Sequence, residues 1–258
     1  MSDTIEHWRK LAASLEQISR GEALADQWTA QAPVASAPRK TNQMEDFFNA
    51  RKEGWGIWKW RHYFDIYERH FSRFRGTEVN ILEVGVYSGG SLDMWRDYFG
   101  PKARLFGMDI QPACKIFERD GTQIMIGDQG DREFWRQFRE QVPQLDIVID
   151  DGSHIPEHQS VTMEELLPHL RPGGVFLCED VHHEDNAFTW MTQALTQKLN
   201  YCAGAVANAD PERSITSPTS AFQSAVGSVH FYPFITVIER NAFAIPEFVA
   251  AKHGTQWL

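Results

Sequence analysis

Short apolar runs alternate with helical patterns through the middle of the chain. The runs are five to seven residues long and cover 79–84, 103–109, 122–126, 145–149 and 174–178. Such runs, bounded by turn residues, are typical of buried strands. Apolar residues recur at helical spacing over 92–99, 132–141, 157–170 and 186–200, and a short irregular link joins the second and third runs. Strands that alternate with helices predict a parallel sheet covered on both faces.

The end of the chain adds a different pattern. Residues 228–232 and 235–239 lie on either side of Pro233 and predict a tight antiparallel pair that closes the sheet. Residues 171–174, Arg-Pro-Gly-Gly, are interpreted as the turn into the fifth strand. The predicted fold class is α/β: a Rossmann-like, doubly wound, seven-stranded sheet, mostly parallel with one antiparallel strand and helices on both faces.

Two further segments precede the first strand. Residues 1–31 carry apolar side chains at helical spacing and 31–40 are rich in Ala and Pro, which predicts an accessory helix and a linker. Aromatic residues recur from Trp55 to Phe74 at a period that predicts a helix packed against the core. We therefore divide the chain into an N-terminal helical extension and linker, 1–43, and a main domain, 44–258. The N-terminal helices are a candidate interface if the chain forms a homo-oligomer.

Composition excludes some classes of partner. The net charge of the 258 residues is −10, and no stretch gathers enough Lys and Arg to attract a phosphate backbone, so we expect no nucleic-acid partner. No apolar run approaches the roughly 20 residues that a bilayer requires. The first residues lack the basic and then apolar order of a signal peptide. We expect a cytoplasmic protein with no membrane partner.

Glycines and polar residues gather just past the first three strands, where ligands bind in an open α/β sheet. The turn after the first strand permits a close backbone approach, and its candidate binding residues are Glu83, Gly85, Tyr87, Gly89 and Ser91. The second strand ends in Asp109, which is placed to accept both hydroxyls of a ribose. The third is followed by Asp128 and Gln129, which are placed to frame an adenine edge.

These three strand ends resemble those of the class I S-adenosylmethionine-dependent methyltransferases. The pattern Glu-x-Gly-x-Tyr-x-Gly-x-Ser over 83–91 resembles the metal-dependent catechol O-methyltransferase branch, and the resemblance covers about residues 55–240. It implies S-adenosylmethionine as the cofactor. A dinucleotide enzyme would carry Gly-x-Gly-x-x-Gly, which residues 83–91 do not supply.

Acidic residues and histidines follow the fourth and fifth strands. They lie in the stretches Asp150-Asp151-Gly-Ser-His154 and Glu179-Asp180-Val-His182-His183. Four carboxylates at one edge of a sheet repel one another unless a cation or a proton lies among them. Oxygen ligands favour Mg²⁺ or Ca²⁺, or Mn²⁺, over zinc.

The spacing of these residues resembles the divalent-cation sugar O-methyltransferases of the mycinamicin type and the cephalosporin hydroxylase and rhamnosyl O-methyltransferase group. The resemblance implies a metal held by Asp151, Glu179 and Asp180, and a catalytic base at His154. His182 and His183 compete for the role of base because they directly follow the metal pair. Asp150 points to the opposite side of its strand from Asp151, so we expect it to support the cofactor site or to pack against a helix.

The predicted function is transfer of the methyl group of S-adenosylmethionine to a hydroxyl of a sugar or diol, a small molecule, with Mg²⁺ or another divalent cation. Three alternatives stay open. The first is a catechol-type O-methyltransferase, and the second is a non-catalytic binding module that keeps the fold. The third is an oxygenase partner, whose redox centre would need His154, His182 and an acid.

Overall fold

The computed structural model describes residues 2–28, 40–182, 186–202, 206–207, 214–251 and 253–254. The chain divides into two compact units, Met1–Lys40 and Thr41–Leu258. The first contains helix α1 (Ser2–Asp26), on which Leu15 and Leu24 are exposed. Most of the predicted linker lies outside the described residues. The predicted domain boundary at residue 43 stays a prediction.

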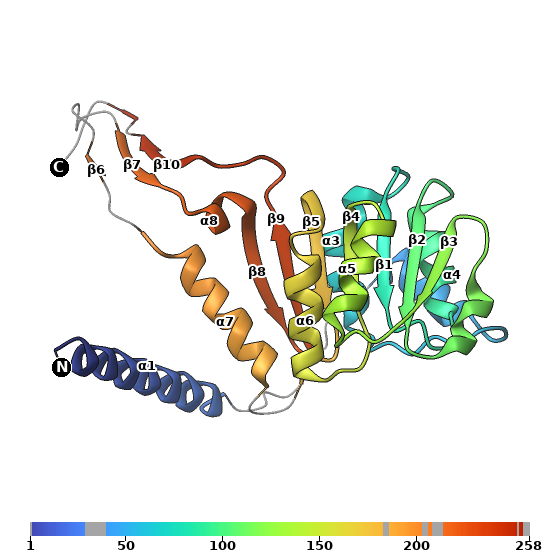
Figure 1. Cartoon of the computed structure of the whole chain (residues 1–258), viewed down its shortest axis with the longest axis horizontal. Helices are drawn as coiled ribbons and strands as arrows, with labels where there is room; N and C mark the ends of the chain where they lie inside the picture. Colours follow the sequence, from blue (N-terminus) through green and yellow to red (C-terminus); the bar gives the residue numbers. More distant parts are fainter. Residues whose placement is uncertain are drawn as a thin grey trace. The chain divides into compact units, whose positions relative to one another are not determined.

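A seven-stranded sheet forms the centre of the second unit (Figure 1). Its strands, in sequence order, are β1 (Asn80–Val84), β2 (Arg104–Asp109), β3 (Thr122–Ile126), β4 (Leu145–Asp150), β5 (Leu170–Cys178), β8 (Val226–Tyr232) and β9 (Ile235–Arg240). In space the order is β3-β2-β1-β4-β5-β9-β8. Every pairing is parallel except those of β9, which runs antiparallel to β5 and β8. The predicted fold class is confirmed.

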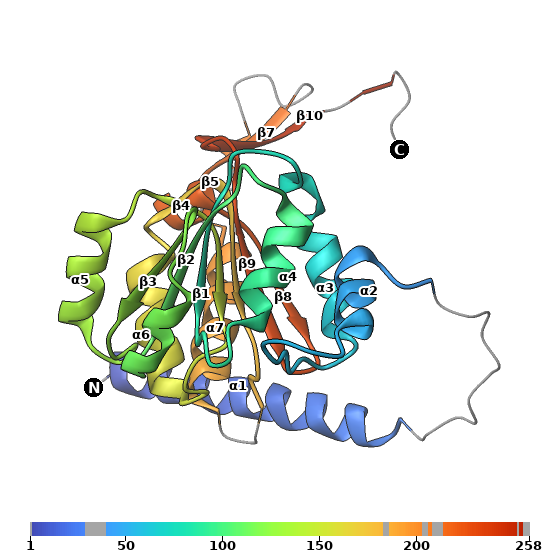
Figure 2. The same ribbon diagram turned by 90° about the vertical axis from the view of Figure 1, so that its right-hand side faces the viewer.

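Helices cover both faces of this sheet (Figure 2). One face packs against α2 (Gln43–Ala50), α3 (Tyr63–Phe71) and α4 (Gly90–Phe99). The other packs against α5 (Arg132–Gln141), α6 (Pro156–Leu166) and α7 (Ala187–Leu199). Side chains of a strand alternate between the faces, so Val175 and Leu177 of β5 enter the first core and Phe176 enters the second.

Two predicted elements have different bounds in the structure. The predicted aromatic helix forms only from Tyr63. Residues 55–60 are not helical, and they follow Gly54, whose φ of +83° lies outside the helical region. The fifth strand begins at Leu170 rather than at 174, because Leu170 is buried and pairs with Leu145. The stretch 171–174 therefore continues the strand and is not a turn, which corrects the prediction.

Smaller elements complete the described chain. The expected irregular link between β2 and β3 contains the 3₁₀ helix η2 (Pro112–Phe117), and η1 (Ser72–Phe74) extends α3. Helix α8 (Ala221–Ala225) precedes β8. A second sheet, not predicted, has the order β10-β7-β6 and consists of β6 (Val206–Ala207), β7 (Ser214–Pro218) and β10 (Glu247–Ala251). Among the described residues, no helix combines the length and the apolarity that crossing a bilayer requires.

The second core should be sensitive to a cavity in β5. Phe176 is fully buried, so Phe176→Ala should lower the free energy of unfolding by about 3 to 5 kcal/mol, because the surrounding side chains cannot fill the lost volume. Phe243 is 84% exposed, and Phe243→Ala should change it by less than about 0.5 kcal/mol. Urea denaturation of both variants measures the difference. Equal losses would contradict the assignment of Phe176 to the core.

Candidate active site

A cavity of ≈ 760 Å³ opens at the carboxyl ends of β1 to β5. The order of the strands reverses between β1 and β4, and such a reversal is where an open α/β sheet binds its ligands. Glycine is required at this point, because a Cβ at Gly85 would lie 2.1 Å from the backbone oxygen of Asp151. The φ of Gly85, +89°, is also one that side chains disfavour. The cavity therefore depends on the turn that the sequence indicated.

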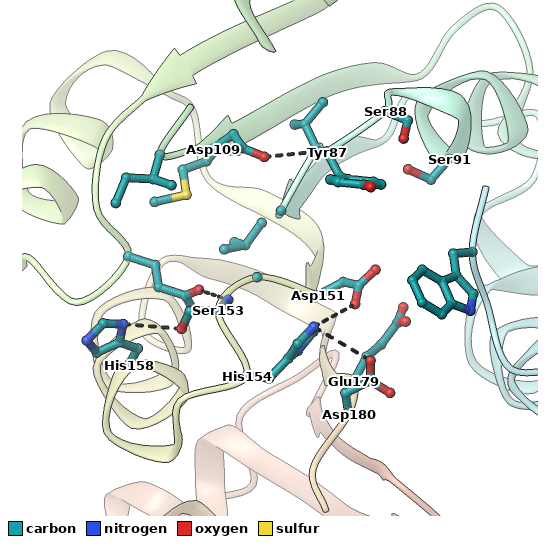
Figure 3. A pocket seen from close by; sticks show the side chains of 18 of the residues that line it. Tyr87, Ser88, Ser91, Asp109, Asp151, Ser153, His154, His158, Glu179 and Asp180 are labelled. Atoms are coloured by element: carbon teal, nitrogen blue, oxygen red, sulfur yellow. Dashed lines mark hydrogen bonds and ion pairs between the residues drawn. The ribbon is translucent and has the colours of Figure 1, made fainter. Parts of the chain in front are cut away.

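Most of the predicted cofactor residues lie at this cavity. The lining includes Gly85, Tyr87, Ser91, Asp109, Asp128 and Gln129. The carboxylate of Asp109 is oriented by two backbone N–H groups, since Oδ2 accepts from Tyr87 (2.9 Å) and Oδ1 accepts from Gln111 (2.8 Å). Figure 3 shows Asp109 beside Tyr87 in the upper part of the cavity. Asp109 is thus held in place before any ligand binds.

The other three predicted cofactor residues, Glu83, Gly89 and Asp150, are not among the lining residues. Glu83 is buried and accepts hydrogen bonds from Ser91 Oγ (2.8 Å) and Trp95 Nε1 (3.0 Å), which tie the turn to α4. Asp150 is buried and accepts from Gln129 Nε2 (3.1 Å). Both carboxylates support the cavity wall in this structure, and their predicted contact with a cofactor stays a prediction.

Burial changes the acid–base behaviour of these carboxylates. Loss of water raises the pKa of Glu83 and of Asp150 to about 7. Burial, followed by the charge of Asp151, also raises the pKa of Glu179, while the charge of Lys59 opposes this rise. Hydrogen bonds to all three carboxylates, and the positive charge of Lys59 near Glu83 and Glu179, partly offset this desolvation. The site therefore holds its negative charge at a cost, which fits a place that receives a cation.

Each of the predicted metal ligands has a donor from the segment before β1. Asp151 Oδ2 contacts Lys59 Nζ (2.5 Å), and Glu179 accepts from both Lys59 Nζ (2.9 Å) and the Tyr67 hydroxyl (2.6 Å). In the case of Asp180, Oδ1 accepts from the Tyr63 hydroxyl (2.6 Å) and from the indole N–H of Trp60 (3.0 Å).

The second oxygens of Asp151 and Asp180 face His154. The imidazole Nε2 of His154 lies 3.9 Å from Asp151 Oδ1 and 3.7 Å from Asp180 Oδ2, distances that exceed a hydrogen bond (Figure 3). Suitable ligand atoms of these three residues all lie within 4.8 Å of one another. His154 Nδ1 is buried and has no hydrogen-bond partner among the described residues. The sequence grouped these residues, and the structure places them together.

The two competing histidines have different positions. His182 also lines the cavity, and its ring packs edge-on against Phe234 with centroids 5.7 Å apart. His183 lies outside the described residues. Of the described candidates for the base, His154 is the one whose imidazole nitrogen faces both Asp151 and Asp180.

Lys59 is the charged site residue that the sequence analysis missed. Its side chain is 2% exposed, and its segment lies close over the start of α4, where a Cβ at Gly90 would be 2.3 Å from the oxygen of Gly56. Burial alone would lower the pKa of Lys59, but the charges of Asp151 and Glu179 outweigh it and raise the pKa, so the amine is an ammonium ion. The sequence places Lys59 between two tryptophans, which marks it as a lysine in an apolar setting. Its position in the sequence, however, does not link it to the ends of β4 and β5.

Residues 82–181 match a family described as a methyltransferase domain. A Mg- and SAH-bound MycE methyltransferase from the mycinamycin biosynthetic pathway superposes with a TM-score of 0.61 at 25% identity, covering 78% of this chain and 55% of that chain. The resemblance to class I methyltransferases that the sequence predicted is confirmed.

Two similar curated proteins are named as O-methyltransferases. The 8-demethyl-8-(2-methoxy-alpha-L-rhamnosyl)-tetracenomycin-C 3'-O-methyltransferase of Streptomyces olivaceus is 41% identical over 49% of this chain and 33% of its own length. The mycinamicin VI 2''-O-methyltransferase of Micromonospora griseorubida is 34% identical over 65% of this chain and 43% of its own length. The chain thus spans a third to about two fifths of the length of these two relatives.

The buried Glu83 should make stability depend on pH. Its pKa rises from an ordinary 4.5 to about 7, so the folded protein favours the protonated acid. The resulting stabilisation is complete below pH 4.5 and is lost as the pH rises to about 7. Relative to wild type, Glu83→Gln should therefore gain up to about 3 kcal/mol between these limits. Urea denaturation across this range, with exposed Glu78→Gln as the control, measures the gain. Parallel pH profiles for Glu83→Gln and wild type would refute the assignment.

Proposed function

We propose that this chain is a divalent-cation-dependent O-methyltransferase that moves the methyl group of S-adenosylmethionine to a hydroxyl of a sugar on a glycosylated natural product. The observation that carries the proposal is the arrangement of Asp151, His154 and Asp180 in the same cavity as Asp109 and the turn at Gly85. The relatives that methylate glycosylated compounds support the class of acceptor.

The residues of the cavity fit S-adenosylmethionine. We assign the ribose hydroxyls to Asp109, whose two oxygens are already aligned by backbone N–H groups and can each accept a further hydrogen bond. The adenine is assigned to the side of Asp128, where the third strand ends. Gly85 allows the chain to pass close to the ligand at the reversal of strand order. S-adenosylmethionine supplies the methyl group as an electrophilic sulfonium.

The acidic residues also fit a hard divalent cation. Asp151 Oδ1 and Asp180 Oδ2 converge on the space before His154, and carboxylate oxygens are the ligands that Mg²⁺ prefers. Glu179, the third ligand implied by the resemblance, has both oxygens engaged by Lys59 and Tyr67 in this structure, so its role as a ligand stays a proposal. A bound divalent cation would act as a Lewis acid that makes the acceptor hydroxyl easier to ionise.

His154 is assigned as the general base. Its Nε2 faces the two carboxylates, so an acceptor hydroxyl placed there would be within reach of the ring, and the neutral imidazole would take its proton. Catalysis would require the cavity to align the hydroxyl oxygen with the methyl carbon and the sulfur of bound S-adenosylmethionine. Methyl transfer then forms the ether and leaves S-adenosylhomocysteine. We assign His182 to contact with the acceptor, because it lines the cavity beside Asp180.

Asp109→Asn should weaken cofactor binding. Removing the negative charge should cost about 1.5 to 3 kcal/mol of affinity for S-adenosylhomocysteine, the scale of charge-assisted hydrogen bonds to the ribose. Isothermal titration calorimetry measures the loss of affinity. The control is Asp120→Asn, at an exposed position in the link between β2 and β3, and it should bind S-adenosylhomocysteine as the wild type does. An unchanged dissociation constant in Asp109→Asn would remove Asp109 from the cofactor site.

His154→Ala should separate binding from chemistry. The variant should keep its affinity for S-adenosylhomocysteine and lose turnover by about 10² to 10⁴, the usual contribution of positioned proton transfer. His182→Ala should instead raise the Michaelis constant of the acceptor and change kcat little. The assay follows labelled methyl from S-adenosylmethionine to a panel that contains mycinamicin VI, a rhamnosylated tetracenomycin and catechol. Exchanged phenotypes would reverse the two roles.

The same panel tests the function itself. We expect transfer to a glycosylated acceptor that stops with a chelator and returns with Mg²⁺. Transfer to catechol alone would replace the acceptor class by phenolic diols. Cofactor binding without transfer to any member would favour the non-catalytic alternative over the enzyme we propose.

A further inference from the structure

A buried ammonium group lies where the carboxylates of the site converge. Lys59 Nζ is 2.5 Å from Asp151 Oδ2 and 2.9 Å from Glu179 Oε2. The side chains of Lys59 and Glu179 are almost completely buried. Among the described residues that line the cavity, Lys59 is the only lysine or arginine. One positive charge therefore already contacts two of the three carboxylates assigned to a divalent cation.

The carboxylate oxygens are divided between Lys59 and the space before His154. Asp151 contacts Lys59 through Oδ2 and faces His154 with Oδ1. Glu179 presents neither oxygen to that space, because one oxygen accepts from Lys59 and the other accepts from Tyr67. A cation held by Asp151, Glu179 and Asp180 together would have to take an oxygen of Glu179 from one of these donors. Lys59 is the donor whose positive charge a cation would repel.

We propose that Lys59 is an internal competitor for the divalent cation: its ammonium group holds Asp151 and Glu179 together until the cation enters, and then leaves Glu179. The inference rests on the proposed function and names a residue that controls metal loading. In the metal-free protein Lys59 compensates carboxylates that would otherwise be buried and unpaired. Cation binding then replaces an existing ion pair, which lowers the affinity for the metal.

Calorimetric titration of the full chain with Mg²⁺ tests the competition. Lys59→Met keeps an apolar stem of similar length and removes the charge, so it should bind Mg²⁺ on the order of tenfold more tightly than wild type. In chelator the variant should melt at a lower temperature than wild type, and Mg²⁺ should narrow the gap. Lys52→Met, an exposed residue of the same segment, should match wild type in both measurements.

A second measurement uses the wild-type chain and does not depend on the folding of Lys59→Met. Amine acetylation followed by mass spectrometry should leave Lys59 protected in chelator and label it faster with saturating Mg²⁺, with the other lysines as internal references. Unchanged protection of Lys59, or equal or weaker Mg²⁺ binding by folded Lys59→Met, overturns the competition and leaves the proposed function standing. If neither protein binds Mg²⁺, the competition and the metal requirement both fall, and S-adenosylhomocysteine binding then tests the cofactor site separately.

Discussion

The contact between the loops that leave β1 and β4 is the constraint on which the site depends. Val84 and Asp150 are paired in register, and the next residue, Asp151, donates its N–H to the oxygen of Val84 (2.9 Å). The two loops are therefore in contact as they leave the sheet, and only a glycine at 85 leaves room for the backbone of Asp151. Because both loops line the cavity, the sheet register fixes the distance between the cofactor side and the acidic side.

The acidic side in turn holds a segment that is distant in sequence. Four side chains of this segment each donate a hydrogen bond to a carboxylate at the end of β4 or β5: Lys59, Trp60, Tyr63 and Tyr67. Buried carboxylates are stable only when they are paired or hydrogen-bonded, so these contacts stabilise the sheet edge and also fix where α3 lies. Folding of the segment before β1 and formation of the site are therefore coupled.

The sequence predicted what depends on local periodicity and on the edge of a parallel sheet. The bounds of α5 and β3 agree with their patterns, and the acidic residues after β4 and β5 meet because parallel strands end at one edge. Lys59 could not be predicted in this way, because its partners are 92 and 120 residues further along the chain. The start of β5 at Leu170 was missed because Pro172 and two glycines indicate a turn, whereas pairing with Leu145 keeps them in the strand.

Backbone strain gathers at the cavity. Among the described residues four that are not glycine have a positive φ, and three of these, Tyr87, His154 and Asp180, line the cavity. Such conformations cost about 1 to 3 kcal/mol each and persist where the surroundings over-determine them. Here the N–H of Tyr87 donates to Asp109 and that of Asp180 to Tyr63. In this conformation one carboxylate oxygen of Asp180 accepts from Tyr63 of α3 and the other faces His154, so the packing of α3 and the acidic side of the site depend on each other.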